Sequence, residues 1–396
     1  MKLLCGDENG LLKVLGFDAE EYETFGVQSR SLGVVGMTSC PIYDVENESQ
    51  AFCVLRCDGS AELWRYDFGE GRLLLDSSVN TGLEIPTGVK ECPSVGLVAH
   101  SKGGDSVVLT TKGKGNELTI CAKFSIAGPV TASACCLGGG LAYGGLENDL
   151  QLYDVNAAKL VWKAKNVAND SLNLRVPIWV SDIAFRSTEE SVSGATMFVG
   201  TGYKHIRGYD TRLESARPTF SFEIEGNFRV TAIEPSKDGC GVYVGEASGG
   251  LYLFDIRTQR RVSTLKGPVG SIREVSSSID SDYVACVGLD RYARVYSTKT
   301  SKAVSHIYIK NRTNFVQFIE DKGRLEKERK SAAVKRKAKG STDEHGDILA
   351  EIGSDLEEDE EDEEDEEDED SELDEDSDKE TEEEAPPPVK VKRAKR

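Results

Sequence analysis

The sequence predicts an all-β protein, a seven-bladed β-propeller followed by a disordered, charged C-terminal tail. Three observations predict it: a short motif that returns about every 45 residues, strand-like segments in a constant order around each copy, and an abrupt change to charged composition after residue 320. The motif is a Gly-rich turn, then alternating apolar residues, then usually an aromatic residue followed by Asp; its clearest copy runs from Gly249 to Asp255. Arrays of such repeats are binding scaffolds more often than catalysts.

Seven copies of the motif can be counted. Two further complete copies end at Asp154 and Asp210. The degenerate copies end at Leu15, Trp64, Cys121 and Tyr296. Successive copies are 49, 57, 32, 56, 45 and 42 residues apart. Seven repeats fit a closed ring, and closure protects the edges of the sheets.

Each repeat has room for four strands. In the sixth copy, apolar segments at 230–233, 241–245, 251–255 and 260–265 are separated by turns rich in Gly, Ser and Asp. Alternating apolar residues between such turns predict antiparallel strands rather than helices. Four strands in 40–45 residues describe one propeller blade.

The two ends of the repeat region indicate how the ring closes. The first apolar run, 3–6, matches the second strand of a blade, so the first blade lacks its innermost strand. Near the other end, 304–309 matches the outer strand of blade seven, and a further apolar run follows at 314–319. We therefore predict that 311–320 supplies the closing strand and that the propeller comprises residues 1–320.

Charge divides the rest of the chain. The formal net charge is −21, but 343–384 alone holds 28 Asp and Glu against one Lys, a charge of −27, which leaves +6 elsewhere. The predicted parts are a basic segment at 321–342, an acidic disordered segment at 343–384 and a basic cluster at 385–396. Fourteen unbroken acidic residues at 357–370 repel one another and offer no apolar surface to bury.

Composition argues against an enzyme or a metalloprotein. The four histidines are scattered and complete no Cys/His metal site, and no paired carboxylates flank a nucleophile. The Gly clusters at 138–140 and 144–145 lack the Lys-Ser/Thr of a phosphate-binding loop. We therefore expect no catalytic residues, no cofactor and no metal.

The ten cysteines lie mostly in apolar strand-like runs, and the chain shows neither a signal peptide nor the roughly 20 apolar residues of a membrane helix. An intracellular, reduced protein is expected, with buried cysteines as small apolar fillers.

Most single residues in the motifs have a structural explanation. Asp154, Asp210, Asp255 and Asp290 lie at turns or strand ends, where an Asp side chain accepts hydrogen bonds from nearby backbone amides. Trp179, between Ile178 and Val180, is expected in the core of a blade rather than as an exposed anchor.

Six arginines near blade edges and turns are candidates for contact with RNA or a partner protein. They are Arg175, Arg207, Arg257, Arg273, Arg291 and Arg294. The planar guanidinium suits phosphate and carboxylate alike, so the residue type does not choose between RNA and an acidic protein surface. Solvation, or pairing with a neighbouring Asp, is the competing interpretation.

These motifs resemble the WD40 superfamily, with Tyr-Asp or Phe-Asp in place of Trp-Asp. Four stretches, 174–179, 201–203, 265–273 and 288–291, resemble the WD repeat-containing protein 74 family in particular. The resemblance is strongest over roughly 174–296 and looser over the first 130 residues. It places Arg175 and Arg273 within family-like segments.

The resemblance implies a non-catalytic ribosome biogenesis factor of the nucleus and nucleolus. Such a factor docks on the pre-60S particle, the precursor of the large ribosomal subunit, and takes part in rRNA processing. The resemblance also implies release by a AAA-type ATPase and a link to the RNA exosome and its helicase. A histone- or chromatin-binding propeller that uses the acidic segment is the alternative.

The tail carries candidates for targeting and modification. Nuclear or nucleolar targeting is expected of Lys335, Arg336, Lys337, Lys339, Lys390, Lys392, Arg393, Lys395 and Arg396. Ser354, Ser371 and Ser377 each have an acidic residue three positions on, which suits an acid-directed kinase. A purely solvating tail explains the same composition.

Overall fold

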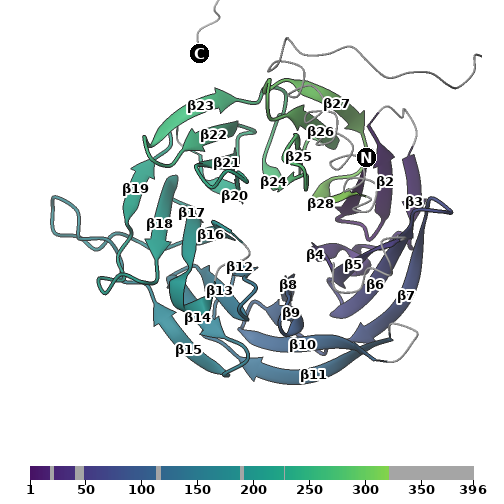
Figure 1. Ribbon diagram of the computed structural model, residues 1–396, viewed down its shortest axis with the longest axis horizontal. Coiled ribbons are helices and arrows are strands. Elements are labelled where there is room, and N and C mark those ends of the chain that lie inside the picture. Colours follow the sequence, from purple (N-terminus) through teal and green to yellow (C-terminus); the bar gives the residue numbers. More distant parts are fainter. Residues whose placement is uncertain (18–21, 41–48, 113–116, 188–190, 227, 321–396) are drawn as a thin grey trace, which may run out of the picture. The chain divides into compact units, whose positions relative to one another are not determined.

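The computed structural model describes residues 1–17, 22–40, 49–112, 117–187, 191–226 and 228–320. Strands β1 to β28 form seven four-stranded antiparallel sheets. The sheets stand side by side around a central axis, like the blades of a propeller (Figure 1). The predicted seven-bladed propeller is therefore confirmed. In the described part of the chain, no helix is long and apolar enough to cross a membrane.

Each blade is numbered here from its innermost strand outward. Blade one is β28 (Thr313–Ile319), β1 (Lys2–Asp7), β2 (Leu12–Gly16) and β3 (Tyr22–Phe25). Blade two is β4 (Val34–Ser39), β5 (Ser49–Arg56), β6 (Ser60–Asp67) and β7 (Arg72–Asn80). Blade three is β8 (Pro86–Cys92), β9 (Gly96–Ser101), β10 (Asp105–Lys112) and β11 (Glu117–Ser125). Blade four is β12 (Ala132–Cys135), β13 (Gly140–Gly145), β14 (Asn148–Asp154) and β15 (Lys159–Lys163).

The remaining three blades follow the same order. Blade five is β16 (Val180–Phe185), β17 (Thr196–Thr201), β18 (His205–Asp210) and β19 (Phe220–Glu223). Blade six is β20 (Val230–Pro235), β21 (Gly241–Glu246), β22 (Leu251–Asp255) and β23 (Arg260–Thr264). Blade seven is β24 (Ile272–Ser277), β25 (Tyr283–Gly288), β26 (Tyr292–Ser297) and β27 (Ala303–Tyr308). Two short 3-10 turns, Arg30–Leu32 and Val192–Gly194, lie in the connections.

The core lies between the blades. The second strand of a blade packs against a neighbour on each face, so every residue of β5, β9, β13 and β21 is buried. The outer strands bury less; β15 and β23 are mostly exposed. This gradient explains why second strands are nearly continuous apolar runs, whereas outer strands carry many charges.

One copy of the repeat lies in a different strand from the one predicted. The copy ending at Cys121 is expected in the third strand of its blade, but Cys121 lies in the outermost strand, β11. The register between third and fourth strands shifts at Trp64, Leu109, Tyr153, Phe254 and Tyr296, so Leu109 in β10 is the equivalent position. The spacing from Trp64 to Leu109 is 45 residues and from Leu109 to Tyr153 is 44. The irregular spacings of 57 and 32 therefore come from this error.

Blade one joins the two ends of the described chain. β28 pairs antiparallel with β1, with Leu3 opposite Phe318 and Gly6 opposite Phe315. The side chain of Lys13 in β2 reaches the carbonyl of Ile309 at 2.6 Å and the carboxylate of Asp7 at 3.2 Å, with both side chains almost fully buried. A buried charge pair is tolerated only when each charge is satisfied, as here.

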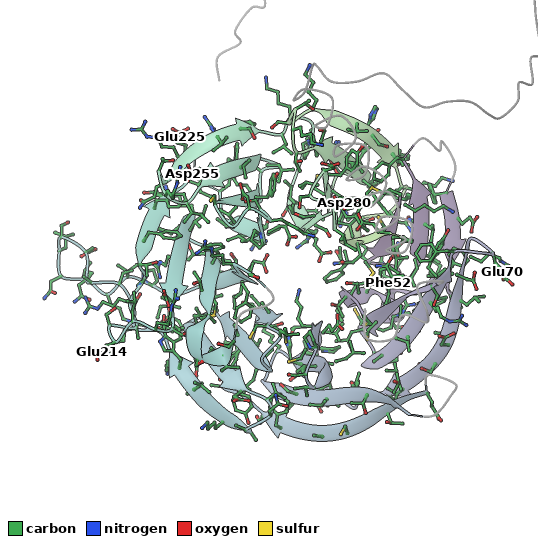
Figure 2. The ribbon with its side chains drawn as sticks, in the orientation of Figure 1. Phe52, Glu70, Glu214, Glu225, Asp255 and Asp280 are labelled. Atoms are coloured by element: carbon green, nitrogen blue, oxygen red, sulfur yellow. The ribbon has the colours of Figure 1, made fainter. Side chains whose placement is uncertain are left out.

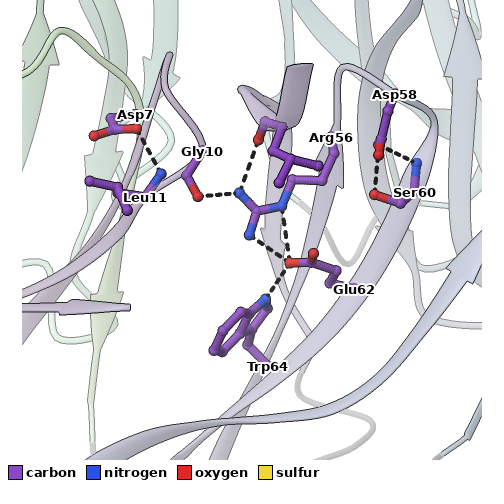
Figure 3. A network of polar contacts seen from close by, with 9 residues as sticks. Asp7, Gly10, Leu11, Arg56, Asp58, Ser60, Glu62 and Trp64 are labelled. Carbon is purple, nitrogen blue, oxygen red and sulfur yellow. Dashed lines mark hydrogen bonds and ion pairs between the residues drawn. The ribbon is translucent and has the colours of Figure 1, made fainter. Parts of the chain in front are cut away.

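Blades one and two are joined by a buried arginine. Arg56, at the end of β5, donates hydrogen bonds to the carbonyls of Gly10 and Leu32 and forms an ion pair with Glu62 (Figure 3). Trp64 donates its indole N–H to the same carboxylate at 2.7 Å. One guanidinium thus satisfies backbone carbonyls from two connections that would otherwise be buried without partners.

Carboxylates on the inner strands connect successive blades. Asp182 accepts the N–H of Ile233 at 2.7 Å, Glu234 that of Ser277 at 3.1 Å, and Glu274 that of Val316 at 2.6 Å. The same contact therefore recurs from blade five through blade six and blade seven to blade one. All three carboxyl groups feel the positive charge of Lys90 in β8.

Candidate interaction surface

One face of the ring is marked by a repeated hydrogen bond. Because adjacent strands are antiparallel, the loops that lead into the innermost strands and the hairpins between second and third strands lie on the same face, called the top face here. In six blades a hairpin amide donates, at 2.9–3.1 Å, to a loop residue directly before the innermost strand. The acceptor carbonyls belong to Gly33, Ile85, Trp179, Arg229, Ser271 and Arg312.

Three of the six predicted arginines lie on the top face. Arg175, in the long loop between β15 and β16, is exposed and forms an ion pair with Glu147 at 2.7 Å. Arg291 is exposed in the hairpin between β25 and β26, where its φ of +65° fits a tight turn. Arg273 is the second residue of β24 and is also exposed.

The other three arginines lie elsewhere. Arg207 in β18 is only 4% exposed and Arg294 in β26 only 9%. Arg294 forms an ion pair with Asp290 and lies over the ring of Tyr292, 4.9 Å from its centroid. Arg257 is well exposed, but its hairpin between β22 and β23 is on the opposite, bottom face. Arg207 and Arg294 are too buried, and Arg257 lies on the opposite face, so none of the three belongs to the surface defined below.

Trp179 is not in the core of a blade, contrary to the expectation. It is half-buried on the top face, directly before β16. Its ring packs edge-on against Tyr203 at 6.0 Å between centroids, and the guanidinium of Arg229 lies 5.5 Å from its centroid. Gly202 lies beneath the ring, where an added Cβ would come within 2.2 Å of it. The absence of a side chain at Gly202 therefore allows the indole to lie flat on the hairpin.

Positive charge gathers beside this aromatic group. The surrounding protein, first by displacing water and then through the charges of Arg229 and Arg312, lowers the pKa of Arg273. Glu8 acts in the opposite direction. Arg273 in blade seven is thus close enough to Arg229 of blade six and Arg312 of blade one for their charges to disfavour its own. An anion bound beside Arg273 would relieve that repulsion.

Exposed apolar side chains lie in the top-face loops that also carry or adjoin the arginines. Phe228 is 51% exposed, and Val269, in the loop before β24, is 72% exposed. Glu225, which follows β19, lies near β23 at the outer rim (Figure 2), and Arg229 directly precedes β20. We call the seven residues together the aromatic–arginine surface: Trp179, Tyr203, Phe228, Arg229, Val269, Arg273 and Arg312. Aromatic residues and Arg are the types enriched at the centres of protein interfaces.

Sequence reasoning missed Arg229, Phe228, Val269 and Arg312. A positional signal existed: the residue directly before each innermost strand lies at the inner end of a top-face loop, and Arg229 and Arg312 hold that position. In blades two and three the same position is occupied by Gly33 and Ile85. Aligning the repeats on their innermost strands would have shown that this position is basic in blades six and one but not in blades two and three.

The motif aspartates act as predicted. Asp154 accepts the N–H of Ala157, Asp210 that of Arg212, Asp255 that of Arg257 and Asp290 that of Tyr292. Within the described ranges, no three His, Cys, Asp or Glu side chains meet as a metal site requires. The ten cysteines all lie in the described residues, and none of them forms a disulfide. The predicted targeting and phosphorylation residues lie outside the described residues.

Comparison with known proteins finds relatives that include WD repeat-containing and ribosome biogenesis proteins. WD repeat-containing protein 74 of Homo sapiens is 34% identical over 176 residues, which are 44% of this chain and 44% of that protein. Ribosome biogenesis protein NSA1 of Saccharomyces cerevisiae is 28% identical over 208 residues, 46% of this chain and 45% of that protein. Ribosome biogenesis protein nsa1 of Schizosaccharomyces pombe is 25% identical over 350 residues, 78% of this chain and 86% of that protein.

The extent of these matches differs. The chain spans less than half the length of the WD repeat-containing protein 74 relatives it matches, and most of the fission-yeast protein. No protein-family model matches the chain. The chain is a homologue of WD repeat-containing protein 74 and of the NSA1 ribosome biogenesis proteins.

Proposed function

We propose that this protein is a non-catalytic ribosome biogenesis factor that docks on a precursor of the large ribosomal subunit through its aromatic–arginine surface. The names of its homologues support a role in ribosome biogenesis. The observation that carries the mode of action is the position of Arg273, whose positive charge is disfavoured by those of Arg229 and Arg312. Arg229 in turn lies over the ring of Trp179. Such a surface suits a partner that presents negative charge next to apolar groups.

The ring suits a scaffold for a physical reason. Seven blades and the interblade bonds of Asp182, Glu234 and Glu274 hold the top-face loops at fixed separations. A preformed surface loses little conformational entropy when it binds, so a few anchors suffice for specific docking. No bond-making chemistry is needed for this role.

The test is a charge reversal in the full-length protein. Arg229→Glu combined with Arg273→Glu should lower co-purification of large-subunit precursors from nuclear extract about tenfold or more, since interface arginines are common hot spots. Quantifying precursor rRNA and large-subunit proteins in the eluate measures the effect. Arg175→Glu and Arg291→Glu, farther out on the same face, should give smaller losses.

A matched control reverses two arginines on the bottom face. Arg212 and Arg257 are exposed and each is paired with the Asp of its own hairpin. Arg212→Glu with Arg257→Glu should leave co-purification unchanged. Full retention by the top-face double variant, with normal thermal unfolding, would exclude this surface. Recovery of histones in place of ribosomal proteins would favour the chromatin alternative.

The proposal also covers the partners of the protein and its location in the cell. We place the protein in the nucleolus, where a AAA-type ATPase releases it from the pre-60S particle during rRNA processing, in contact with the RNA exosome helicase. Adding ATP to particles purified on the tagged protein should then release it. Persistent binding with ATP, when the ATPase is present in the particles, would count against this release step.

A further inference from the structure

A groove of mixed polar and apolar lining lies at the seam where blade seven meets blade one. Its volume is about 930 Å³, and it is bordered by β27 on one side and by β2 and β3 on the other. In Figure 1 this seam lies beside the label N, between β27 and β2. Binding sites for compact ligands have volumes of about 300–1,000 Å³. The groove is therefore large enough for more than one nucleotide or amino-acid residue.

The lining of the groove combines hydrogen-bond donors with the apolar residues Leu11, Phe17, Val304 and Ile307. Lys310 and His306 supply donors, together with Thr24, Gln28 and Asn311, and among the described residues no Asp or Glu lines the groove. Lys13 also borders it, but its charge is already paired with Asp7. The nearest carboxylate, Asp7, is fully buried and already accepts hydrogen bonds from the amides of Asn9 and Leu11 and from the side chain of Asn311. The positive charge of Lys310 is therefore left for a ligand.

Flat aromatic rings accompany these donors. Tyr22 and Tyr308 line the groove from opposite blades, and Tyr308 is 48% exposed. Tyr308 also packs against Tyr292, with 5.3 Å between ring centroids. Burial, followed by the proximity of Tyr308, raises the pKa of Tyr22, so its phenol remains a neutral donor. Exposed rings beside cations are the usual platform for unstacked bases.

The groove is continuous with the charge on the top face. Lys310 is two residues before Arg312, and the charge of Arg312 reaches Arg273. Arg312 is only loosely held by Glu8, at 3.9 Å, and remains half exposed. Lys310 and Arg312 thus extend from the seam groove towards the innermost strand, along the loop that leads into β28.

We propose that the seam groove binds a segment of single-stranded RNA, with phosphates on Lys310 and Arg312 and bases against Tyr22 and Tyr308. The inference rests on the proposed function only for the source of this RNA, a ribosomal precursor. It assigns direct RNA contact to a site separate from the centre of the aromatic–arginine surface, which it meets at Arg312.

An acidic or phosphorylated peptide fits these observations less well. A phosphoresidue is held by a compact cluster of arginines. Here a lysine, Lys310, lies in the groove, and the amide donor Asn311 separates it along the chain from Arg312. A spaced row of charge with aromatic faces matches the repeating phosphates and bases of a nucleic-acid strand. The peptide is retained as an outcome of the test.

The test is photocrosslinking of the full-length protein to a short 4-thiouridine RNA, with the crosslinked peptides mapped. Crosslinks are expected in peptides that contain Tyr22 and Tyr308. Lys310→Glu should reduce crosslinking in these peptides several-fold and lower the salt dependence of RNA binding by about 0.7 in log–log slope, the value for one phosphate contact. Mapping separates this site from any binding by the basic tail.

Lys302→Glu is the matched control, because Lys302 precedes the same strand at its other end, on the bottom face. It should leave crosslinking unchanged, and both variants should melt like the wild type. Crosslinks confined to residues 321–396, or unaffected by Lys310→Glu, would overturn the proposal. Displacement of the RNA by a phosphoserine peptide of equal charge would also overturn it, in favour of a protein ligand.

The outcome is independent of the docking test. If Arg229→Glu with Arg273→Glu abolishes particle binding but keeps the Tyr22 and Tyr308 crosslinks, the groove inference stands while docking depends on the other surface. If Lys310→Glu loses the crosslinks but particle binding persists, the groove binds RNA and docking does not depend on it.

Discussion

The carboxyl group of Glu274 lies on an innermost strand, half-buried, and accepts the N–H of Val316 at 2.6 Å. Burial raises its pKa to about 8, while the charge of Lys90 and the hydrogen bond act in the other direction. Glu234, one blade earlier, has its pKa raised by burial to about 7. The pKa of Asp182 is shifted upward as well, also by burial first. Three neighbouring carboxyl groups therefore hold protons more tightly in the folded ring than in the unfolded chain.

This predicts a loss of stability with rising pH. The folded pKa values lie above the unfolded ones, so between about pH 4.5 and 8 the unfolded chain binds fewer protons and the free energy of unfolding falls. Glu274→Gln keeps an acceptor oxygen for Val316 but cannot ionise. It should match the wild type at pH 5 and be more stable at pH 8.5, by on the order of 1–2 kcal/mol after allowance for solvent screening at this half-buried position.

Denaturant unfolding at the two pH values measures this difference. The control is Glu70→Gln, because Glu70 is exposed in the hairpin between β6 and β7. That substitution should change stability equally at both pH values. A Glu274→Gln variant whose stability falls with pH as steeply as that of the wild type would show that Glu274 is ionised throughout the range.

Residue roles could be predicted from the sequence where they depend on neighbours in the chain. The turn aspartates are of this kind, because the amide that each one accepts is two or three residues away. Arg207 and Trp179 are not. Arg207 is buried in the third strand of its blade, where its charge acts on Asp149 of the adjacent blade. Trp179 is held by Gly202 and Arg229, from a hairpin and a loop far along the chain.

At the level of strands, the sequence is informative because each blade is built from local hairpins. Strand order and turn positions follow from alternation and Gly-rich turns over about 45 residues. Blade three shows the limit: β10 ends in Thr110, Thr111 and Lys112 rather than an aromatic–Asp pair, so the sequence motif points one strand too late. The register shift at Leu109, which identifies the position, depends on pairing that periodicity alone does not specify.

The closing strand supports a prediction about stability. β28 buries Val316, Phe318 and Ile319, and its pairing with β1 covers the inner edge of blade one. Deleting 311–320 removes these side chains and leaves that edge unpaired, so the melting temperature should fall by about 10 °C or more and aggregation should increase. Deleting 341–396 should change the melting temperature little. Differential scanning calorimetry of both deletions checks this, and equal, small shifts would contradict the role of β28.

At the scale of the whole molecule, charge is separated along the chain. The segment 343–384 carries −27, and the rest of the protein carries +6. An RNA approaching the top face or the basic segments therefore meets a net negative protein, and the acidic segment opposes non-specific binding. Replacing 343–384 by a Gly/Ser linker of equal length removes this opposition without changing the number of residues between the basic segments.

The linker variant should bind unrelated RNA more tightly than the full-length protein at low salt, and the difference should shrink as the Debye length falls from about 10 Å at 0.1 M salt to about 3 Å at 1 M. Filter binding of a random-sequence RNA across that salt range measures it. Co-purification of specific partners should be preserved, because the aromatic–arginine surface is intact. Equal affinity of the two proteins for random RNA at every salt concentration would mean that the acidic segment does not oppose non-specific binding. If the linker variant instead loses binding to histones alone, the segment has a role in chromatin binding.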